Sequence, residues 1–249
     1  GNESTYFFDP LLPVRELTFS ASRYFIQESM LWEGINVSLF YLEDAEYLWS
    51  AEGLSIAEEA FELFTQIGEY PYPTLNIVEE YTQHGGMEHP LQIYIASDYS
   101  DYSSANPYFK EVVAHEMGHQ WFYHLIGNDE VDVGHLDEGL TCWLDDWYQN
   151  VHAGAAPSQL FEDYTAINTV MNYYTQNLGE EDPVNTSILD YSEPNDYWYN
   201  AYTKAPALFE KLRSEIGHAD FIEGLSLLFD RFQFKIAWFP DVQEAFEDA

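Results

Sequence analysis

Apolar and polar residues alternate in the first part of the chain, with the period of two that is typical of strands. The alternating apolar positions are Ile35, Val37, Leu39 and Tyr41, and more weakly Leu17, Phe19 and Ala21. Glu33–Gly34 is expected to form a turn before the clearer of the two patterns. The pattern therefore predicts strands within residues 1–48.

From Ser50 onward the apolar residues recur every three to four positions, which indicates amphipathic helices. The first helix is expected over 57–67, with Gly68 closing it, and two short strands are expected over 75–79 and 91–96. Further helices are expected at 107–119, from Glu138, over 157–176, over 204–216, after Gly217 and after Pro240. Loops are expected over 96–108 and 177–196. Strands followed by helices are typical of an α+β fold.

The predicted helix after Pro107 carries the motif His115-Glu116-Met117-Gly118-His119. Residues four apart lie on one face of a helix, so the two imidazoles can converge on one Zn²⁺. Glu116 then lies beside the position that a catalytic zinc keeps open for water. The motif predicts a hydrolytic zinc site.

A catalytic zinc needs a third protein ligand, and Glu138 is the candidate. It begins an amphipathic segment in which Leu140, Trp143, Leu144, Trp147, Tyr148 and Val151 recur at helical spacing. An antiparallel helix beside the first would bring Glu138 to the two histidines. The alternative is a solvated acidic loop. Asp137 and Asp145 could each orient a ligand imidazole, and the sequence does not choose between them.

Three motifs in order resemble those of the alanyl-aminopeptidase family of gluzincins. The segment HEMGHQWF (115–122), together with Glu138 after eighteen residues that separate it from His119, resembles the family's zinc signature. Residues 85–89 (GGMEH) are similar to its substrate-anchoring GxMEN motif, with His89 in place of Asn. Residues 202–206 (YTKAP) are similar to its Tyr-x-Lys-Gly segment, with Ala-Pro in place of Gly. The resemblance extends from about Val14 to the end of the chain.

The resemblance implies a thermolysin-like catalytic domain at 49–249, with a small mixed sheet and a helical part. Residues 1–48 would then be the terminal strands of an N-terminal all-β domain, most of which is missing from this chain. Because the family draws a second contact to the substrate amine from that domain, we expect this chain to bind substrate more weakly than the full-length protein.

The resemblance also assigns roles to residues. One Zn²⁺ per chain would be held by His115, His119 and Glu138, and Glu116 would be the general base. Tyr202 would stabilise the oxyanion. On chemistry alone Tyr191, Tyr197 and Tyr199 would serve equally well. The residues expected to bind the substrate are Gly85, Gly86, Met87 and Glu88, with the Glu88 carboxylate holding a free α-ammonium group.

The predicted function is therefore zinc-dependent removal of N-terminal residues from peptides. One alternative is a hydrolase on the same scaffold, with endopeptidase or epoxide-hydrolase activity. Another is a zinc-stabilised binding domain without turnover. The presence of Glu116 and Tyr202 weighs against the last alternative, because a structural zinc is normally closed by a fourth Cys or His.

The charge of the chain limits the classes of partner that it can bind. Asp and Glu number 44 against 8 Lys and Arg, which gives a net charge of −36. Such a chain cannot neutralise phosphates, so nucleic acid and anionic membrane surfaces are excluded as partners. The negative field favours cationic ligands such as a peptide ammonium group, and it favours an extracellular or cell-envelope location over a cytoplasmic one. No run of eighteen apolar residues predicts a membrane span, and Cys142 is the single cysteine, so no internal disulfide is expected.

Overall fold

A hairpin opens the fold where the alternation is clearest. In the computed structural model, β1 (Ile26–Trp32) pairs antiparallel with β2 (Ile35–Tyr41). Glu33 and Gly34 form the turn with φ of 43° and 96°, the left-handed conformations that two-residue hairpin turns require. The apolar side chains of β2 at Val37, Leu39 and Tyr41 are fully buried. The predicted strand and turn are confirmed.

The structure describes residues 9, 11–82, 84–97, 107–152, 182–191, 193 and 195–249. The helix expected over 157–176 lies outside these residues, as does most of the loop expected over 96–108. In the described part of the chain, no helix is both long enough and apolar enough to cross a bilayer.

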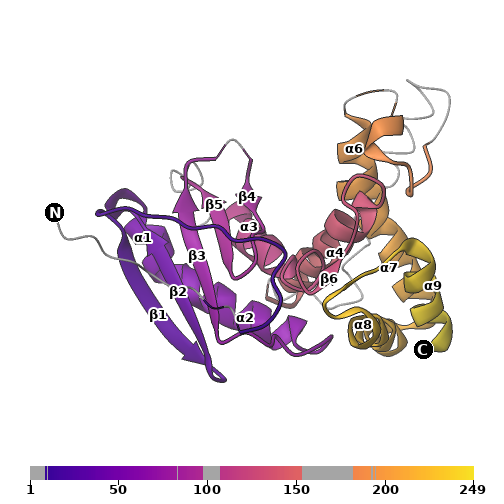
Figure 1. Cartoon of the computed structure of the whole chain (residues 1–249), viewed down its shortest axis with the longest axis horizontal. Helices are drawn as coiled ribbons and strands as arrows, with labels where there is room; N and C mark the ends of the chain where they lie inside the picture. Colours follow the sequence, from indigo (N-terminus) through magenta and orange to yellow (C-terminus); the bar gives the residue numbers. More distant parts are fainter. Residues whose placement is uncertain are drawn as a thin grey trace.

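Five strands form one mixed sheet in the order β1-β2-β3-β5-β4 (Figure 1). β3 (Thr74–Glu80) runs parallel to β2 and to β5 (Gln92–Ala96), and the short edge strand β4 (Gly86–Met87) runs antiparallel to β5. The sheet crosses the boundary expected at residue 48, because β2 precedes it and β3 follows it. β1 and β2 therefore belong to the same sheet as β3, β5 and β4. An all-β domain before them stays a prediction.

The strand expected over residues 17–21 is wrong. That stretch is extended but pairs with no strand of the described chain, and Leu17 and Phe19 are 76% and 79% exposed. The intervening polar residues face the protein instead: the Thr18 hydroxyl lies 2.7 Å from that of Tyr94 in β5. Apolar and polar residues do alternate along this stretch, but the polar side chains are the ones that contact the rest of the protein.

The first helical segment covers the sheet. It comprises η1 (Glu43–Ala45), α1 (Glu46–Leu48), the π-helix η2 (Trp49–Gly53) and α2 (Leu54–Phe64). The apolar positions that predicted a helix are buried at Ala57, Ala60, Phe61, Phe64 and Ile67. α2 ends at Phe64, before the expected Gly68, and it packs against β1, β2 and the helix that follows the sheet.

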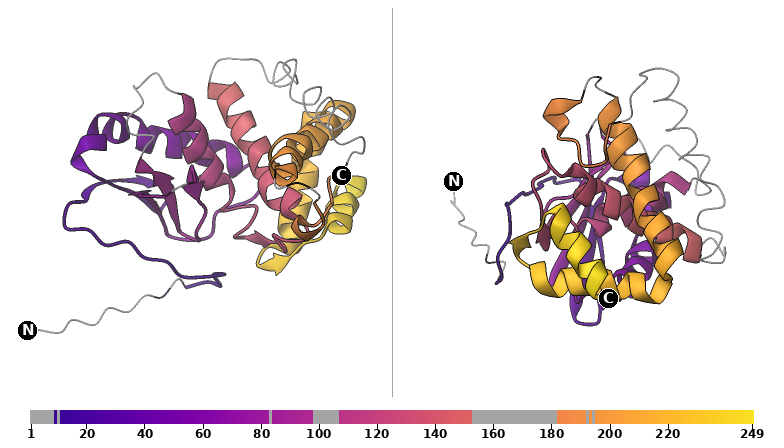
Figure 2. Two further views of the ribbon diagram at one scale, coloured as in Figure 1. Left: turned by 90° about the horizontal axis from the view of Figure 1, so that it is seen from above. Right: turned by 90° about the vertical axis from the view of Figure 1, so that its right-hand side faces the viewer.

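The second half of the described chain is helical. Its elements are α3 (Pro107–Gly118), β6 (Ile126–Gly127), α4 (Gly134–His152), η6 (Ile188–Asp190), α6 (Asp196–Tyr199), the π-helix η7 (Asn200–Lys204), α7 (Ala205–Ile216), α8 (His218–Phe232), β7 (Lys235–Ile236) and α9 (Phe239–Asp248). Gly217, with φ of 96°, separates α7 from α8 as predicted. α4 begins at Gly134, one turn before the expected start at Glu138. α3 and α4 pack together between the sheet and helices α7 to α9 (Figures 1 and 2).

Candidate active site

The end of α3 brings two histidines together. α3 begins at Pro107, and its last turn continues through His119, whose backbone N–H donates to the His115 carbonyl at 3.3 Å. The two imidazoles therefore lie on one face, and their Nε2 atoms are 3.1 Å apart. This is the arrangement that the spacing predicts.

The packing of α4 against α3 adds a carboxylate to the pair. Glu138 Oε2 lies 3.3 Å from His115 Nε2 and 3.4 Å from His119 Nε2. It is buried, and no donor among the described residues is aligned with it. Burial opposes the ionisation of Glu138, but the neighbouring imidazoles of His119 and His115 hold its pKa well below the usual range. The structure thus brings the three predicted ligands together.

The geometry of this triad fits a zinc ion. Ligand atoms bound at about 2.0–2.1 Å in a tetrahedral shell lie roughly 3.3–3.4 Å from one another. The three separations of 3.1–3.4 Å agree with that value. Two imidazoles and one carboxylate are also a donor set of catalytic zinc sites that leaves a fourth position open. His115, His119 and Glu138 could therefore hold Zn²⁺.

Two aspartates lie close to the Nδ1 atoms of the two histidines. Asp145 Oδ2 lies 2.9 Å from His115 Nδ1. Asp137 Oδ1 lies 2.9 Å from His119 Nδ1, whose N–H is aligned with the Phe122 carbonyl oxygen at 3.1 Å. With Nδ1 engaged on both rings, the Nε2 lone pairs are directed at the centre of the triad. The sequence left the choice between the aspartates open. The structure pairs Asp145 with His115 and places Asp137 close to His119, whose N–H is aligned with the Phe122 carbonyl.

Glu116 lies beside the triad without joining it. Its side chain is 5% exposed, burial raises its pKa to about 8, and Oε2 has no partner in the part of the chain that is described. One carboxylate oxygen of Glu88, one of Glu116 and one ring nitrogen of His119 all lie within 4.8 Å of one another. Glu116 is therefore placed between the candidate metal site and the segment that follows β4.

Tyr202 also contacts two residues of the triad. It lies in the π-helix η7, and its hydroxyl donates to Glu138 Oε1 while its ring stacks on that of His115 at 6.2 Å. The Tyr197 ring packs edge-on against that of Tyr202, with the ring centroids 5.8 Å apart. A π-helix widens one turn and often marks a functional site. Of the candidate tyrosines, Tyr202 has a hydroxyl that bonds directly to a predicted zinc ligand, Glu138.

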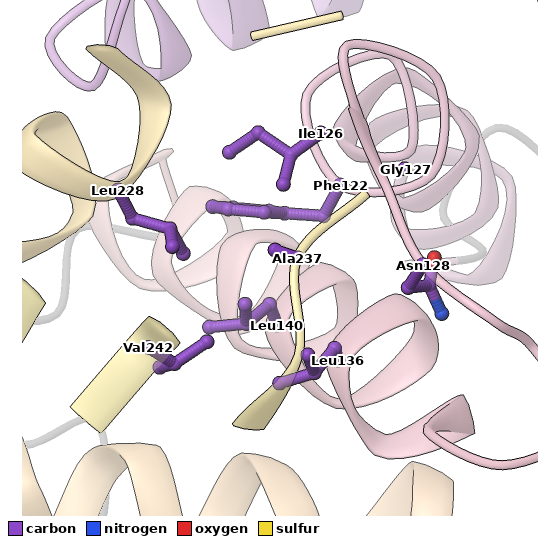
Figure 3. A pocket seen from close by; sticks show the side chains of 9 residues that line it. All are labelled: Phe122, Ile126, Gly127, Asn128, Leu136, Leu140, Leu228, Ala237 and Val242. Carbon is purple, nitrogen blue, oxygen red and sulfur yellow. The ribbon is translucent and has the colours of Figure 1, made fainter. Parts of the chain in front are cut away.

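The small pocket in Figure 3 is a different feature. It is lined by Phe122, Ile126, Gly127, Asn128, Leu136, Leu140, Leu228, Ala237 and Val242. Leu136 and Leu140 are each two positions from Glu138, which places them on another side of α4. The lining contains none of the triad residues, so this is an apolar gap in the helix packing and not the candidate active site.

The comparison with known proteins decides the family. Residues 51–249 match the family model described as the peptidase family M1 domain.

The chain belongs to peptidase family M1.

Three relatives whose names are those of aminopeptidases agree with the resemblance that the motifs indicate. The chain is 26% identical over 140 residues to alanine/arginine aminopeptidase of Saccharomyces cerevisiae, covering 56% of this chain and 16% of that protein. It is 24% identical over 212 residues to aminopeptidase 2 of Candida albicans, covering 78% and 22%. It is 26% identical over 163 residues to aminopeptidase N of Lactococcus lactis, covering 64% and 19%. The matched part thus spans between 16% and 22% of the length of each relative.

A solved M1 structure supports the fold. The E323A mutant of an M1 zinc metallopeptidase from Deinococcus radiodurans superposes with a TM-score of 0.64 and 14% identity, over 90% of this chain and 48% of that one. The predicted α+β class, with a mixed sheet and a helical part, is confirmed.

Some residues near the candidate zinc site were not predicted from the sequence. The Thr141 hydroxyl lies 3.2 Å from His119 Nδ1, and the Cys142 thiol lies 3.9 Å from His115 Nδ1. Thr141 follows Glu138 by three positions and Cys142 by four. The helical period could therefore have placed both residues on the same face of α4 as Glu138. Gln120 contacts the segment after β4. No sequence period links these two parts of the chain.

The Gly86→Ala variant should impair the M1 site without removing metal. A Cβ at Gly86 would lie 2.2 Å from Glu116 Oε1, so the carboxylate must move. We expect kcat to fall about 10–100-fold, because a displacement near 1 Å has effects of this size, while zinc content is retained. Steady-state kinetics and metal analysis measure both. Gly34→Ala is the control. A Cβ at Gly34 in the hairpin turn would have no atom within 4 Å, so this variant should affect stability alone. An unchanged kcat in Gly86→Ala would show that Glu116 tolerates the shift.

Proposed function

We propose that this chain carries the catalytic centre of a zinc aminopeptidase, which hydrolyses the first peptide bond of substrates with a free amino terminus. The observation that carries the proposal is the set of separations of 3.1–3.4 Å between His115 Nε2, His119 Nε2 and Glu138 Oε2, with Glu116 beside them. Membership of family M1 and the similarity to aminopeptidases support it.

Zn²⁺ bound by the triad would polarise the scissile carbonyl group and lower the pKa of a water molecule. Glu116 accepts a proton from the attacking water and delivers it to the nitrogen of the leaving amine, so that the C–N bond breaks as the carboxylic acid forms. The partnerless Oε2 atom is available for both transfers.

Tyr202 is the donor proposed for the oxyanion that forms during the attack. Burial raises its pKa well above the ordinary value, and the adjacent Glu138 carboxylate adds to this, so the hydroxyl keeps its proton. A donor held beside the carbonyl before the reaction stabilises the negative charge as it develops. The stacking on His115 and the bond to Glu138 support this placement.

The substrate is proposed to lie along β4. This strand pairs with β5 on one side, and no other strand of the described residues pairs with it, so an extended peptide can add to its free edge. Glu88 follows β4 directly and lies within 4.8 Å of Glu116 and His119. Its carboxylate would bind the α-ammonium group and so restrict cleavage to the first peptide bond. Gly85, Gly86 and Met87 would line the peptide.

Acetylation of the substrate amine tests this proposal. We expect the zinc-loaded chain to cleave a free peptide at least about 100-fold faster, in kcat/KM, than its acetylated form. Glu88→Gln should lower kcat/KM for the free peptide about 10–100-fold, because a charge-assisted hydrogen bond is lost. Glu58→Gln on the exposed face of α2 is the matched control. Equal rates on both peptides in the wild-type chain would refute the aminopeptidase assignment and leave endopeptidase activity, whereas no cleavage at all would refute hydrolysis.

A further inference from the structure

Gln120 ties the end of the zinc helix to the segment that carries Glu88. It follows His119 directly and is fully buried. Its Oε1 atom accepts a hydrogen bond from the Leu91 backbone N–H at 3.0 Å. Its Nε2 group donates to the backbone carbonyls of Glu88 and His89, both at 3.3 Å. Both ends of this amide therefore contact the same four-residue segment.

The segment from 88 to 91 depends on such contacts for its shape. Gln92 N–H donates to the His89 carbonyl at 3.2 Å, which closes the turn between β4 and β5. Leu91 in this turn has φ of 62°, a left-handed conformation that a leucine adopts only when its surroundings hold it there. The bond from Leu91 N–H to Gln120 is one of the contacts that do so.

The side chain of His89 is fixed separately, by a 2.6 Å contact between its Nδ1 and Glu16 Oε1. Glu16 lies in the extended stretch before the hairpin, well away from the zinc helix in sequence. The Glu16 side chain is 40% exposed, so it contacts the turn from the solvent side, whereas the fully buried Gln120 contacts its backbone from the core side. Of these two contacts, the one through Gln120 leads directly to a predicted zinc ligand.

We infer that Gln120 is a positioning residue that sets the place of the Glu88 carboxylate relative to His119, and that it thereby determines the preference for a free amino terminus. The inference rests on the proposed function. The path from the metal site to Glu88 is short: one peptide bond joins His119 to Gln120, and one hydrogen bond joins Gln120 to the backbone of Glu88. Movement of this backbone would move the carboxylate that must meet the substrate amine.

Gln120→Met tests this inference, because Met has a similar size but cannot make the three hydrogen bonds. The measured quantity is the ratio of kcat/KM for a free peptide to that for its acetylated form, in the zinc-loaded full chain. The ratio does not depend on the fraction of variant that is folded, so a loss of stability does not obscure it. We expect the ratio to fall about tenfold, mainly through a higher KM for the free peptide, with zinc content unchanged.

Gln243→Met, on the exposed side of α9, is the matched control and should keep the wild-type ratio. Gln120→Glu is a second variant: it keeps an acceptor for Leu91 N–H but turns an oxygen toward two carbonyl oxygens, and it should also lower the ratio. A wild-type ratio in both Gln120 variants would overturn the inference and leave the proposed function intact. A wild-type chain that does not distinguish the two peptides would refute the proposed function, and the inference would fail with it.

Discussion

Replacing Glu116 with Gln is expected to abolish turnover while zinc stays bound. Gln has nearly the same shape as Glu, but its amide cannot accept the proton of the attacking water or return it to the leaving amine. Glu116 is not among the three atoms that form the triad, so the affinity for metal should change little. We expect kcat to fall about 1,000-fold or more. Steady-state kinetics on a free peptide and metal analysis of the same sample give both quantities.

The control for Glu116→Gln is Glu62→Gln, which makes the same chemical change on the exposed side of α2. It should keep both activity and metal. Turnover near the wild-type rate in Glu116→Gln would remove this residue from the mechanism. A loss of zinc together with activity would instead make Glu116 part of the metal site.

Replacing Glu138 with Gln should remove both the metal and the activity. The neutral amide is a poor zinc ligand, and the two imidazoles alone do not complete a catalytic site. We expect the affinity for Zn²⁺ to fall at least about 100-fold, by comparison with the 10–100-fold effects of residues that only orient ligands. A ligand that binds the folded state alone stabilises it by about 4 kcal/mol at a thousandfold excess over Kd. Zinc should therefore raise the melting temperature of the wild-type chain much more than that of the variant.

Asp132→Asn is the control for Glu138→Gln, because Asp132 is an exposed carboxylate just before the same helix. It should leave the rise in melting temperature unchanged. An equal rise in Glu138→Gln and the wild-type chain would exclude Glu138 as a ligand and place the zinc elsewhere among the many acidic side chains.

Local sequence patterns predicted the parts of the site that depend on one element. The four-residue spacing of His115 and His119 places both rings on one helical face, and the structure keeps them there. The hairpin around Glu33–Gly34 followed from alternation and a turn signal. Glu138 required two helices to pack side by side. The spacing made it a candidate ligand, and the family resemblance then supported that choice.

Other contacts between elements could not be predicted from the sequence. Asp137 and Asp145 lie on one helix, and which histidine each orients depends on how α4 is rotated against α3. The alternation of residues 17–21 predicted the right period but not the face that meets the protein, because exposed apolar side chains look like core ones in a sequence. Gln120 and Glu88 are thirty-two residues apart, and only the packed fold shows that they meet.

The most direct test of the account is a crystal structure of the zinc-loaded chain with anomalous scattering measured at the zinc absorption edge. We expect one strong peak, about 2.0–2.2 Å from His115 Nε2, His119 Nε2 and Glu138 Oε2, with Glu116 outside bonding distance. A peak at another group of side chains, or a Glu138 carboxylate directed away from a zinc ion held by the two histidines, would contradict it.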